Sequence, residues 1–471
     1  MTLDSTGPFA RTRSLSCFAV FGGGALAAAM TLLACSDDEP SRAAFDDDAG
    51  PRPSLPEAGD PADGSAVDAR GPFDPRDEAV TCDASPCVTQ IVAGDDHFCA
   101  RIADGTVRCW GDDSRGQLGQ GGLPDEGEAD KPRVADVQGV TQLSAAGATT
   151  CARVDDGGVL CWGSNAHGEL GRAIDPPADE DPHPTPERVA IDAAARVDVG
   201  PRSVCATTSA GGVSCWGNDE SAQLARGEPQ YEPGAPAPAE LGVAVKRTGA
   251  GFDTGFALTA DGALLTWGAV AGTTGVLAGR VSSVTPTPVP SSVERLEKIT
   301  SFAVSGTTPG RLPPDALPWM PPPPPNQHAC AVMNGDAFCW GKSERGALGS
   351  GLPDSVVPLP TLARLGTRAY AQQIAAGGET TCVRLTDGNV ACTGENERGQ
   401  LGKGAAGPFA STFTAASTLS GRAVQVAVAK ETVCALVQGG TVSCWGGNAH
   451  GELGLGSRDD DAHPSAAKIT F

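Results

Sequence analysis

Cysteines recur along the chain in pairs whose members stand ten positions apart. The stretch "CARIADGTVRCWG" begins at Cys99, and "CARVDDGGVLCWG" and "CALVQGGTVSCWG" begin at Cys151 and Cys434. Cysteine thiols can bind a metal ion or oxidise to a disulfide. A zinc site would need close pairs such as Cys-x-x-Cys, which the sequence lacks. The spacing therefore predicts disulfides, provided that the residues in between bring the two cysteines face to face.

A β-hairpin between the two cysteines meets this requirement. In "CARIADGTVRC" we expect a three-residue turn over residues 103–105, in which Gly105 supplies the left-handed residue. The flanking strands then place Cys99 directly opposite Cys109, close enough for a covalent bond. The same turn ends in glycine in four other units, at Gly157, Gly211, Gly388 and Gly440.

Two departures from the pattern support the hairpin. Cys330 and Cys339 are one residue closer together. The turn between them is Asn334-Gly335, typical of a two-residue type I′ hairpin, so the cysteines are again opposite each other. In another unit Phe256 and Thr266 replace both cysteines at once. Neither departure leaves a cysteine without a partner.

The motif "CDASPC" adds one more pair, and seven disulfides are expected in all. They are Cys82–Cys87, Cys99–Cys109, Cys151–Cys161, Cys205–Cys215, Cys330–Cys339, Cys382–Cys392 and Cys434–Cys444. Fully paired cysteines indicate an oxidising compartment.

The hairpins belong to a longer repeat. Its first cysteine, or the residue in its place, stands at positions 99, 151, 205, 256, 330, 382 and 434. Each unit contains an apolar stretch ending in glycine, the hairpin, and a loop similar to Gly-x-Asn-x-x-Gly-Gln-Leu-Gly. A proline-rich segment with a short valine-rich strand follows. Seven units of short strands predict an all-β fold, either a closed propeller or a solenoid.

The repeat resembles the regulator of chromosome condensation repeat, most clearly in "IVAGDDHFCARIADGTVRCWGDDSRGQLGQG". The resemblance covers about residues 88 to 471 and implies a seven-bladed β-propeller. Cysteine-paired units of this kind are similar to those of secreted bacterial proteins. One unit lacks the loop motif, and another has Thr393 where tryptophan is expected. The tryptophans of the other units are expected to pack between blades rather than to bind a ligand: Trp110, Trp162, Trp216, Trp267, Trp340 and Trp445.

The two ends of the repeat region predict how the ring closes. The first unit begins at an inner strand, "VTQIVAG", with no strand before it, and the chain ends in "HPSAAKITF". We expect residues 468–471 to complete the sheet that begins near Val88. Such a clasp would join the termini and leave no open sheet edge.

Residues 1–34 are predicted to be a lipoprotein signal peptide. Arg11 and Arg13 precede an apolar run from Leu15 to Ala34, which is nearly long enough to cross a membrane. The run ends in "LLAC", which resembles a bacterial lipoprotein signal whose cysteine, Cys35 here, is lipidated. Ser36 resembles the residue found in lipoproteins of the outer membrane. A plain signal peptide and a retained helix are the alternatives, and the side of the outer membrane stays open.

Residues 35–81 are predicted to be a disordered acidic linker that carries the lipid, and residues 82–471 the propeller. The linker is rich in aspartate and proline and poor in large apolar residues. The whole chain has a formal net charge of -23. That charge disfavours nucleic acid as a partner and limits membrane contact to the lipid anchor.

An insertion of about residues 307–328 lengthens the fifth unit. It holds five consecutive prolines, which favour a stiff extended segment, directly after Trp319 and Met320. Arg311, Trp319 and Met320 are the candidate binding residues, because a large aromatic beside a rigid segment loses little entropy on binding. The alternative is a linker loop whose tryptophan packs back on the blade.

We expect a surface-tethered, non-catalytic binding scaffold, a monomeric propeller whose partner is a protein or a polysaccharide. The alternatives are a structural envelope component and, less favoured, a propeller hydrolase or lyase. No phosphate-binding loop, His-Glu-x-x-His or Gly-x-Ser-x-Gly motif occurs. Neither a cofactor nor a metal is expected. His97 and His328 precede hairpin cysteines, where the family has a histidine in a structural turn, and His167 and His450 lie in repeated loops.

Overall fold

The computed structural model describes one compact unit that begins at Asp68. The described residues are 70, 72–75, 78–123, 128–173, 177–269, 279, 286–305, 327–353 and 355–471. The predicted signal peptide and Cys35 lie outside these residues, as do Arg311, Trp319 and Met320 of the insertion. In the part of the chain that is described, no helix is both long and apolar enough to cross a membrane.

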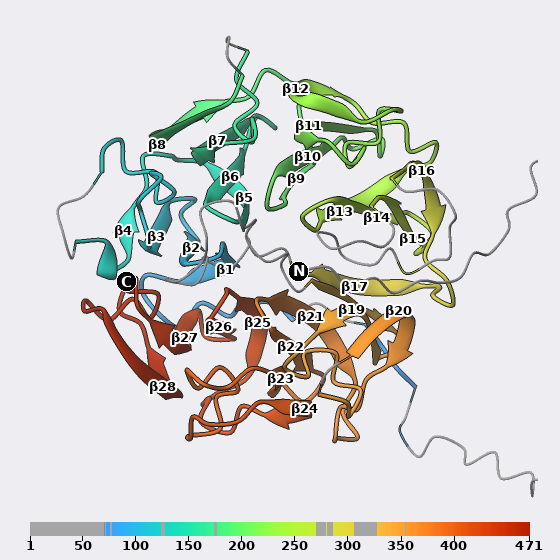
Figure 1. The fold of residues 1–471 in the computed structure, drawn as a ribbon. Helices are drawn as coiled ribbons and strands as arrows, with labels where there is room; N and C mark the ends of the chain where they lie inside the picture. Colours follow the sequence, from blue (N-terminus) through green and yellow to red (C-terminus); the bar gives the residue numbers. More distant parts are fainter. Residues whose placement is uncertain are drawn as a thin grey trace, which may run out of the picture. The chain divides into compact units, whose positions relative to one another are not determined.

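Seven antiparallel sheets of four strands each form the fold, which confirms the seven-bladed propeller. Each sheet takes four consecutive strands, so we number the blades 1 to 7 in chain order. The sheets are arranged in a ring with their first strands at the centre (Figure 1). One short 3-10 helix, η1 (Glu128–Asp130), precedes the last strand of blade 1.

The first two strands of each blade carry the most regular part of the repeat. The innermost strands are β1 (Val88–Ala93), β5 (Val140–Ala146), β9 (Arg196–Val199), β13 (Val245–Ala250), β17 (Ile299–Val304), β21 (Ala371–Gly377) and β25 (Ala423–Val428). The second strands are β2 (His97–Ile102), β6 (Thr149–Val154), β10 (Ser203–Thr207), β14 (Thr254–Thr259), β18 (His328–Met333), β22 (Thr380–Leu385) and β26 (Thr432–Val437).

The third strands are mostly buried, whereas the fourth strands at the rim are largely exposed. The third strands are β3 (Val107–Gly111), β7 (Val159–Asn165), β11 (Val213–Asp219), β15 (Leu264–Gly268), β19 (Asp336–Ser343), β23 (Val390–Gly394) and β27 (Thr441–Asn448). The fourth strands are β4 (Arg133–Val134), β8 (Asp179–Arg188), β12 (Gln230–Pro238), β16 (Thr287–Ser292), β20 (Ser355–Leu362), β24 (Ala410–Ala415) and β28 (Asp459–Lys468).

Antiparallel order gives the ring two faces. The turns between second and third strands lie on one face, which we call the hairpin face. The connections from first to second and from third to fourth strands lie on the other, which we call the loop face. Ser305 and Gln327, the described residues that flank the insertion, follow β17 and precede β18, and therefore belong to the loop face.

The cysteine hairpins have the predicted register. Cys99 pairs with Cys109 directly across β2 and β3, and Phe256 faces Thr266 in the blade without cysteines. In blade 5 the turn residues Asn334 and Gly335 both have positive φ, 52° and 81°, as a type I′ turn requires. The structure contains the seven disulfides that the spacing predicts, including Cys82–Cys87.

The core lies between neighbouring blades. All six tryptophans of the repeat are buried there, as expected. The Trp162 indole N–H donates to the Gln117 carbonyl of the preceding blade at 2.9 Å. A Cβ added at Gly119 would stand 2.6 Å from that indole nitrogen, so the last glycine of the loop motif makes room for the ring.

Blade 6 replaces its missing tryptophan from another strand. Thr393 fills the position and its Oγ1 donates to the Gly346 carbonyl at 2.9 Å. Phe413 of β24 is buried against Gly349 of the preceding loop, with its ring 2.6 Å from the position of an added Cβ. The phenyl ring thus occupies the space that an indole fills in the other blades.

The predicted clasp between the termini is wrong. β28 pairs with β27 of its own blade, and β4 completes the sheet of β1 to β3. The ring closes through the contacts used at every other junction. The Val88 N–H donates to the Gly440 carbonyl at 3.0 Å, as the Val140 N–H does to Gly105. At the chain end, Phe471 contacts Trp110 edge-on, with ring centroids 5.6 Å apart.

The end of the predicted linker lies on the propeller. The Arg70 guanidinium bonds Asp336 of blade 5 at 2.8 Å, and Phe73 packs on Tyr370 with ring centroids 5.4 Å apart. Glu78 accepts a hydrogen bond from Arg422 Nε at 2.6 Å. We call the described residues between 70 and 81 the strap. It crosses the hairpin face from blade 5 to blade 7, so its residues are ordered although their composition predicts disorder.

Candidate functional site

The loops between third and fourth strands form the framework of the loop face. In blade 7, Asn448 Oδ1 accepts from the Leu453 N–H at 3.2 Å, and its Nδ2 donates to the Ser457 carbonyl at 3.0 Å. The Trp110 indole of blade 1 donates to the Glu452 carbonyl of the same loop at 2.8 Å. This loop is thus held both from within and by its neighbour, which fixes its shape before any partner binds.

Two loops also hold the outer strand of the next blade. Arg115 of blade 1 donates through Nη1 to the Glu180 carbonyl, and its own carbonyl accepts from the His183 N–H at 2.9 Å. In blade 6, Arg398 bonds the Asp460 carbonyl and the His463 N–H in the same way. β8 and β28 each bulge at this point.

The bulges present acidic side chains to solvent. His183 Nε2 bonds Asp179 Oδ1 at 2.7 Å, which folds the strand so that the residues between them project. The Glu180 side chain is 73% exposed. We call the exposed residues of the two bulges the acidic ridges: Glu180, Asp181, Asp460 and Asp461.

The junction of blades 7 and 1 brings two carboxylates together. Glu452 occupies the glutamine position of the loop motif, and Asp96 is the facing residue of blade 1. His450 lies between them, with Nδ1 3.3 Å from Glu452 Oε1 and 4.0 Å from Asp96 Oδ1. The hydrogen bond to Glu452 raises the pKa of His450 to about 9, and burial raises the pKa of Asp96 to about 6. At the junction of blades 2 and 3, Glu169 instead faces a cation, Arg202.

These three residues have the side-chain types of a metal site. Their ligand atoms lie within 4.8 Å of one another. A metal would have to displace the proton of His450, whose pKa the hydrogen bond to Glu452 raises to about 9. The donor set therefore fits a charge-balanced contact between blades better than a metal centre.

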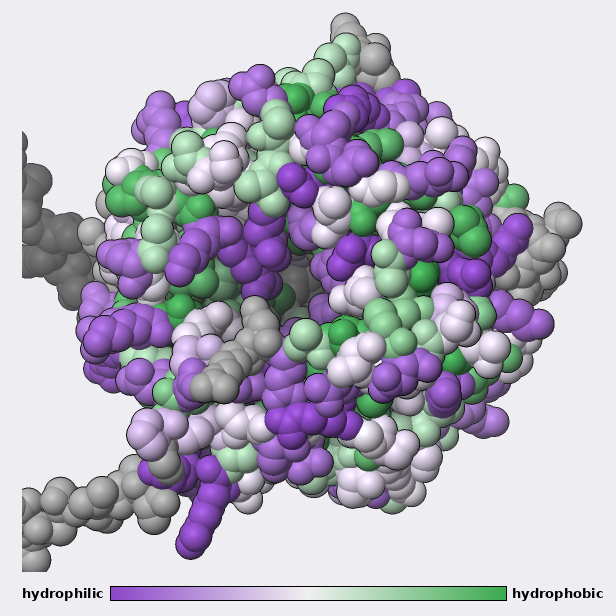
Figure 2. Space-filling view, turned by 180° about the vertical axis from the view of Figure 1, so that it is seen from behind, coloured by the Kyte–Doolittle hydropathy of each residue, from purple (hydrophilic) through white to green (hydrophobic). Residues whose placement is uncertain are grey.

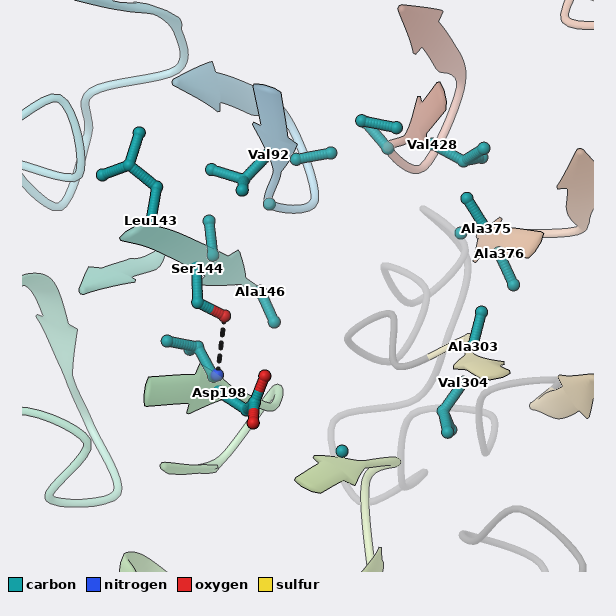
Figure 3. A pocket seen from close by; sticks show the side chains of 18 of the residues that line it. Val92, Leu143, Ser144, Ala146, Asp198, Ala303, Val304, Ala375, Ala376 and Val428 are labelled. Atoms are coloured by element: carbon teal, nitrogen blue, oxygen red, sulfur yellow. Dashed lines mark hydrogen bonds between the residues drawn. The ribbon is translucent and has the colours of Figure 1, made fainter. Parts of the chain in front are cut away.

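A cavity of about 280 Å³ lies at the centre of the ring, lined by the innermost strands of all seven blades. Seen from behind, hydrophilic residues surround a hollow near the middle of the molecule (Figure 2). Small apolar side chains such as Val92, Ala146 and Val304 line it (Figure 3). The dashed line in Figure 3 is the hydrogen bond from the Val199 N–H to Ser144 Oγ, 2.9 Å long.

Glutamines near the start of the innermost strands join the blades at the cavity wall. Gln142 accepts from the Val197 N–H at 2.9 Å and donates to the Val197 carbonyl at 2.7 Å. Gln90, Gln373 and Gln425 make the same pair of bonds to the next blade. Sequence reasoning missed this set, although the glutamines recur nine positions before a hairpin cysteine.

Two of the histidines that the sequence singles out join blades. His97 Nε2 bonds Thr150 Oγ1 at 2.8 Å, and His328 Nε2 bonds Thr381 Oγ1 at 2.7 Å. Burial lowers the pKa of both imidazoles to about 4, so both are neutral. The candidate binding residues of the insertion, Arg311, Trp319 and Met320, lie outside the described residues, so they remain predictions.

Comparison with known families accounts for this geometry. A model of the regulator of chromosome condensation (RCC1) repeat matches residues 88–117, 140–169 and 371–400, the first three strands and following loop of blades 1, 2 and 6. A second model of the repeat matches residues 334–384. The chain is a propeller of RCC1 repeats. The RCC1 loop motif is the segment that the buried tryptophans and asparagines hold on the loop face.

Several proteins share these repeats. The ultraviolet-B receptor UVR8 of Arabidopsis thaliana is 26% identical over 79% of this chain and 80% of its own length. The X-linked retinitis pigmentosa GTPase regulator of Homo sapiens is 31% identical over 28% of this chain, which covers 13% of that protein. Among solved structures, Prp20p of Saccharomyces cerevisiae has a TM-score of 0.63 at 18% identity, over 84% of this chain and 88% of that one.

Proposed function

We propose that this propeller is a non-catalytic scaffold that binds a protein partner with a basic surface through its loop face. The acidic ridges carry the proposal. They are exposed carboxylates, of which Glu180 pairs with Arg115 at 2.9 Å, on strands that neighbouring blades hold in place, so binding would cost little conformational entropy. Carboxylates arranged in this way steer a partner of opposite charge.

The strap favours the loop face over the hairpin face. It covers the hairpin turns of blades 5 to 7, and the chain meets the propeller there at Arg70. We further propose that the segment before the strap tethers the propeller to the bacterial cell envelope through a lipid on Cys35, with the outer membrane as the site of the anchor. The loop face would then point away from the attachment point.

Relatives support binding as the class of function. Prp20p is described with its binding properties to Gsp1p and histones, and the same yeast protein has been solved with Kap60 bound. The ligase HERC3 of Homo sapiens matches this chain over only 13% of its own length. The shared part is therefore the repeat region, and no ligase activity is carried over to this chain.

The test uses the unit that begins at Asp68 as bait for envelope and culture extracts. Glu180→Lys combined with Asp460→Lys should abolish capture of the partner. The matched control, Asp104→Lys with Asp387→Lys, reverses two exposed acids in hairpin turns and should leave capture unchanged. Equal capture of the same partner by both double variants would reject the loop face as the binding surface.

The anchor has a separate test. Metabolic labelling with a fatty acid should mark the wild-type protein and not Cys35→Ala. A variant that still takes up label would contradict lipidation at this position, whatever the pull-down shows.

A further inference from the structure

Blades 3 and 4 depart from the glutamine pattern of the cavity wall. Arg196 and Arg247 occupy the position, nine residues before the hairpin residue, where four other blades have glutamine. A glutamine there makes two hydrogen bonds to the next blade, and neither arginine makes them. At the junction of blades 3 and 4, Asp198 makes the hydrogen bond to the backbone of the next blade instead: it accepts from the Thr248 N–H at 3.0 Å. The four blades that have glutamine at this position show that packing between blades does not require an arginine there.

The charges of the two arginines are unequally satisfied. Arg196 Nε donates to Asp198 Oδ1 at 2.7 Å. The other oxygen of Asp198 accepts from the backbone N–H and Oγ1 of Thr248. Arg247 Nε is 4.0 Å from Asp198 Oδ1, beyond hydrogen-bonding distance. Both oxygens of Asp198 therefore already accept hydrogen bonds from groups other than Arg247.

Arg247 packs against an aromatic ring. Its guanidinium lies over the Phe302 ring, 4.8 Å from the centroid, and its buried Nε has no partner among the described residues. Burial, together with repulsion by Arg196, lowers the pKa of Arg247 to about 10, so it stays charged at neutral pH. The side chain keeps 38% of its surface because it borders the cavity, whereas protein encloses its other sides.

We propose that the central cavity binds a small organic monocarboxylate, with its carboxylate on Arg247 and Arg196 and its apolar part along the innermost strands. An arginine fork matches a carboxylate. Two arginines and Asp198 leave one net positive charge, which suits a monoanion better than a phosphate dianion. The volume of about 280 Å³ admits a short aliphatic chain, for which Val92, Ala146 and Val304 offer apolar contacts on a lining that is otherwise mostly polar.

The other charged groups of the cavity lie at its other end. Asp95 and Lys430 line the opposite end, on the loop face, where the Lys430 N–H donates to the Asp95 carbonyl at 2.8 Å. The carboxylate of the ligand is therefore expected at the hairpin-face end of the cavity, where the innermost strands begin.

Isothermal titration calorimetry of the full chain with hexanoate tests the proposal. Hexanoate should bind with a saturable heat, whereas hexanamide and hexylamine, of the same size, should not. Arg247→Gln installs the residue that four other blades use, so the fold should persist while hexanoate affinity falls about tenfold or more. Arg345→Gln, which removes a half-buried arginine that pairs with Glu397 on the loop face, is the matched control and should bind hexanoate as the wild type does.

A second variant keeps the test decisive. Ala376→Leu should fill the apolar section of the cavity and abolish hexanoate binding while both arginines remain. The proposal is overturned if the wild type gives no saturable heat with hexanoate, if hexanamide or sulfate binds equally well, or if a folded Arg247→Gln protein keeps the wild-type affinity. The pull-down described above does not depend on this cavity, so the two results can be told apart.

Discussion

Asp113 stands where the loops of blades 2, 6 and 7 have asparagine. Its Oδ1 accepts from the Leu118 N–H at 2.9 Å, as the asparagine oxygen does elsewhere, but its Oδ2 is buried without a partner among the described residues. Burial raises the pKa of Asp113 to about 7. The folded state therefore binds the proton more tightly than the unfolded chain, and stability is lost as the pH rises from about 4 to about 7.

Asp113→Asn should stabilise the protein by about 1–3 kcal/mol above pH 7, because it keeps the hydrogen bond and removes the buried charge. The gain should vanish near pH 4, where the native aspartate is already protonated. Denaturant unfolding at both pH values measures it. Asp219→Asn, at the same position of blade 3 and with a pKa raised to about 6, should behave alike. An equal gain at both pH values would contradict the assignment.

His450 separates the carboxylates of Asp96 and Glu452. Its pKa is raised to about 9, so its contribution to stability is complete below pH 6.5 and is lost as the pH rises through 9. His450→Ala should therefore lower the melting temperature at pH 7 and have little effect near pH 10. His167→Ala is the control, because Glu169 already faces Arg202. Addition of a metal chelator or of zinc should change neither the wild-type nor the variant melting curve.

Local chemistry made the hairpins predictable at the scale of the element. Turn glycines and cysteine spacing fix the register within a dozen residues, so even the shorter turn of blade 5 could be assigned. The strap could not, because its contacts with Asp336, Tyr370 and Arg422 join residues hundreds of positions apart. For the same reason the sequence did not single out the two cavity arginines, Arg196 and Arg247. Their positions stand out only once the glutamine contacts between blades are known.

Because the strap ties blades 5 to 7 together, its removal should weaken the ring. A chain that begins at Cys82 should melt about 2–6 °C below one that begins at Asp68, since it lacks the bonds of Arg70 and Glu78. Differential scanning calorimetry of both chains measures the difference. Identical melting temperatures would show that the strap contacts contribute nothing to stability.

At the scale of the whole molecule, the closing junction does not differ in kind from the others. Gln425 bonds the Ile91 N–H and carbonyl across it, just as Gln142 bonds Val197. The clasp was predicted because the first unit begins without an outer strand and the chain ends in a strand that could pair with it. The structure shows instead that both end blades are complete sheets, so closure depends on backbone hydrogen bonds and side-chain packing between them.

Deletion of residues 469–471 tests this mode of closure. It removes the buried Ile469 and the Phe471 ring from Trp110 but leaves every strand ladder intact. We expect a lower melting temperature and faster hydrogen exchange in β1, β2 and β26, with β9 to β20 unchanged. The control, Val289→Ala on an exposed outer strand, should have no effect. Loss of protection around the whole ring would point to a shared strand after all.

The coincidence of sequence unit and complete sheet has a consequence for how such chains change over time. A duplication or exchange of one unit of about fifty residues transfers a whole blade, with its own disulfide and its own loop. No strand then has to find a new partner in a distant part of the gene. Individual blades can therefore diverge as independent modules. Blade 4, which lacks the cysteines and the loop motif, and the arginines of blades 3 and 4 are differences of this kind.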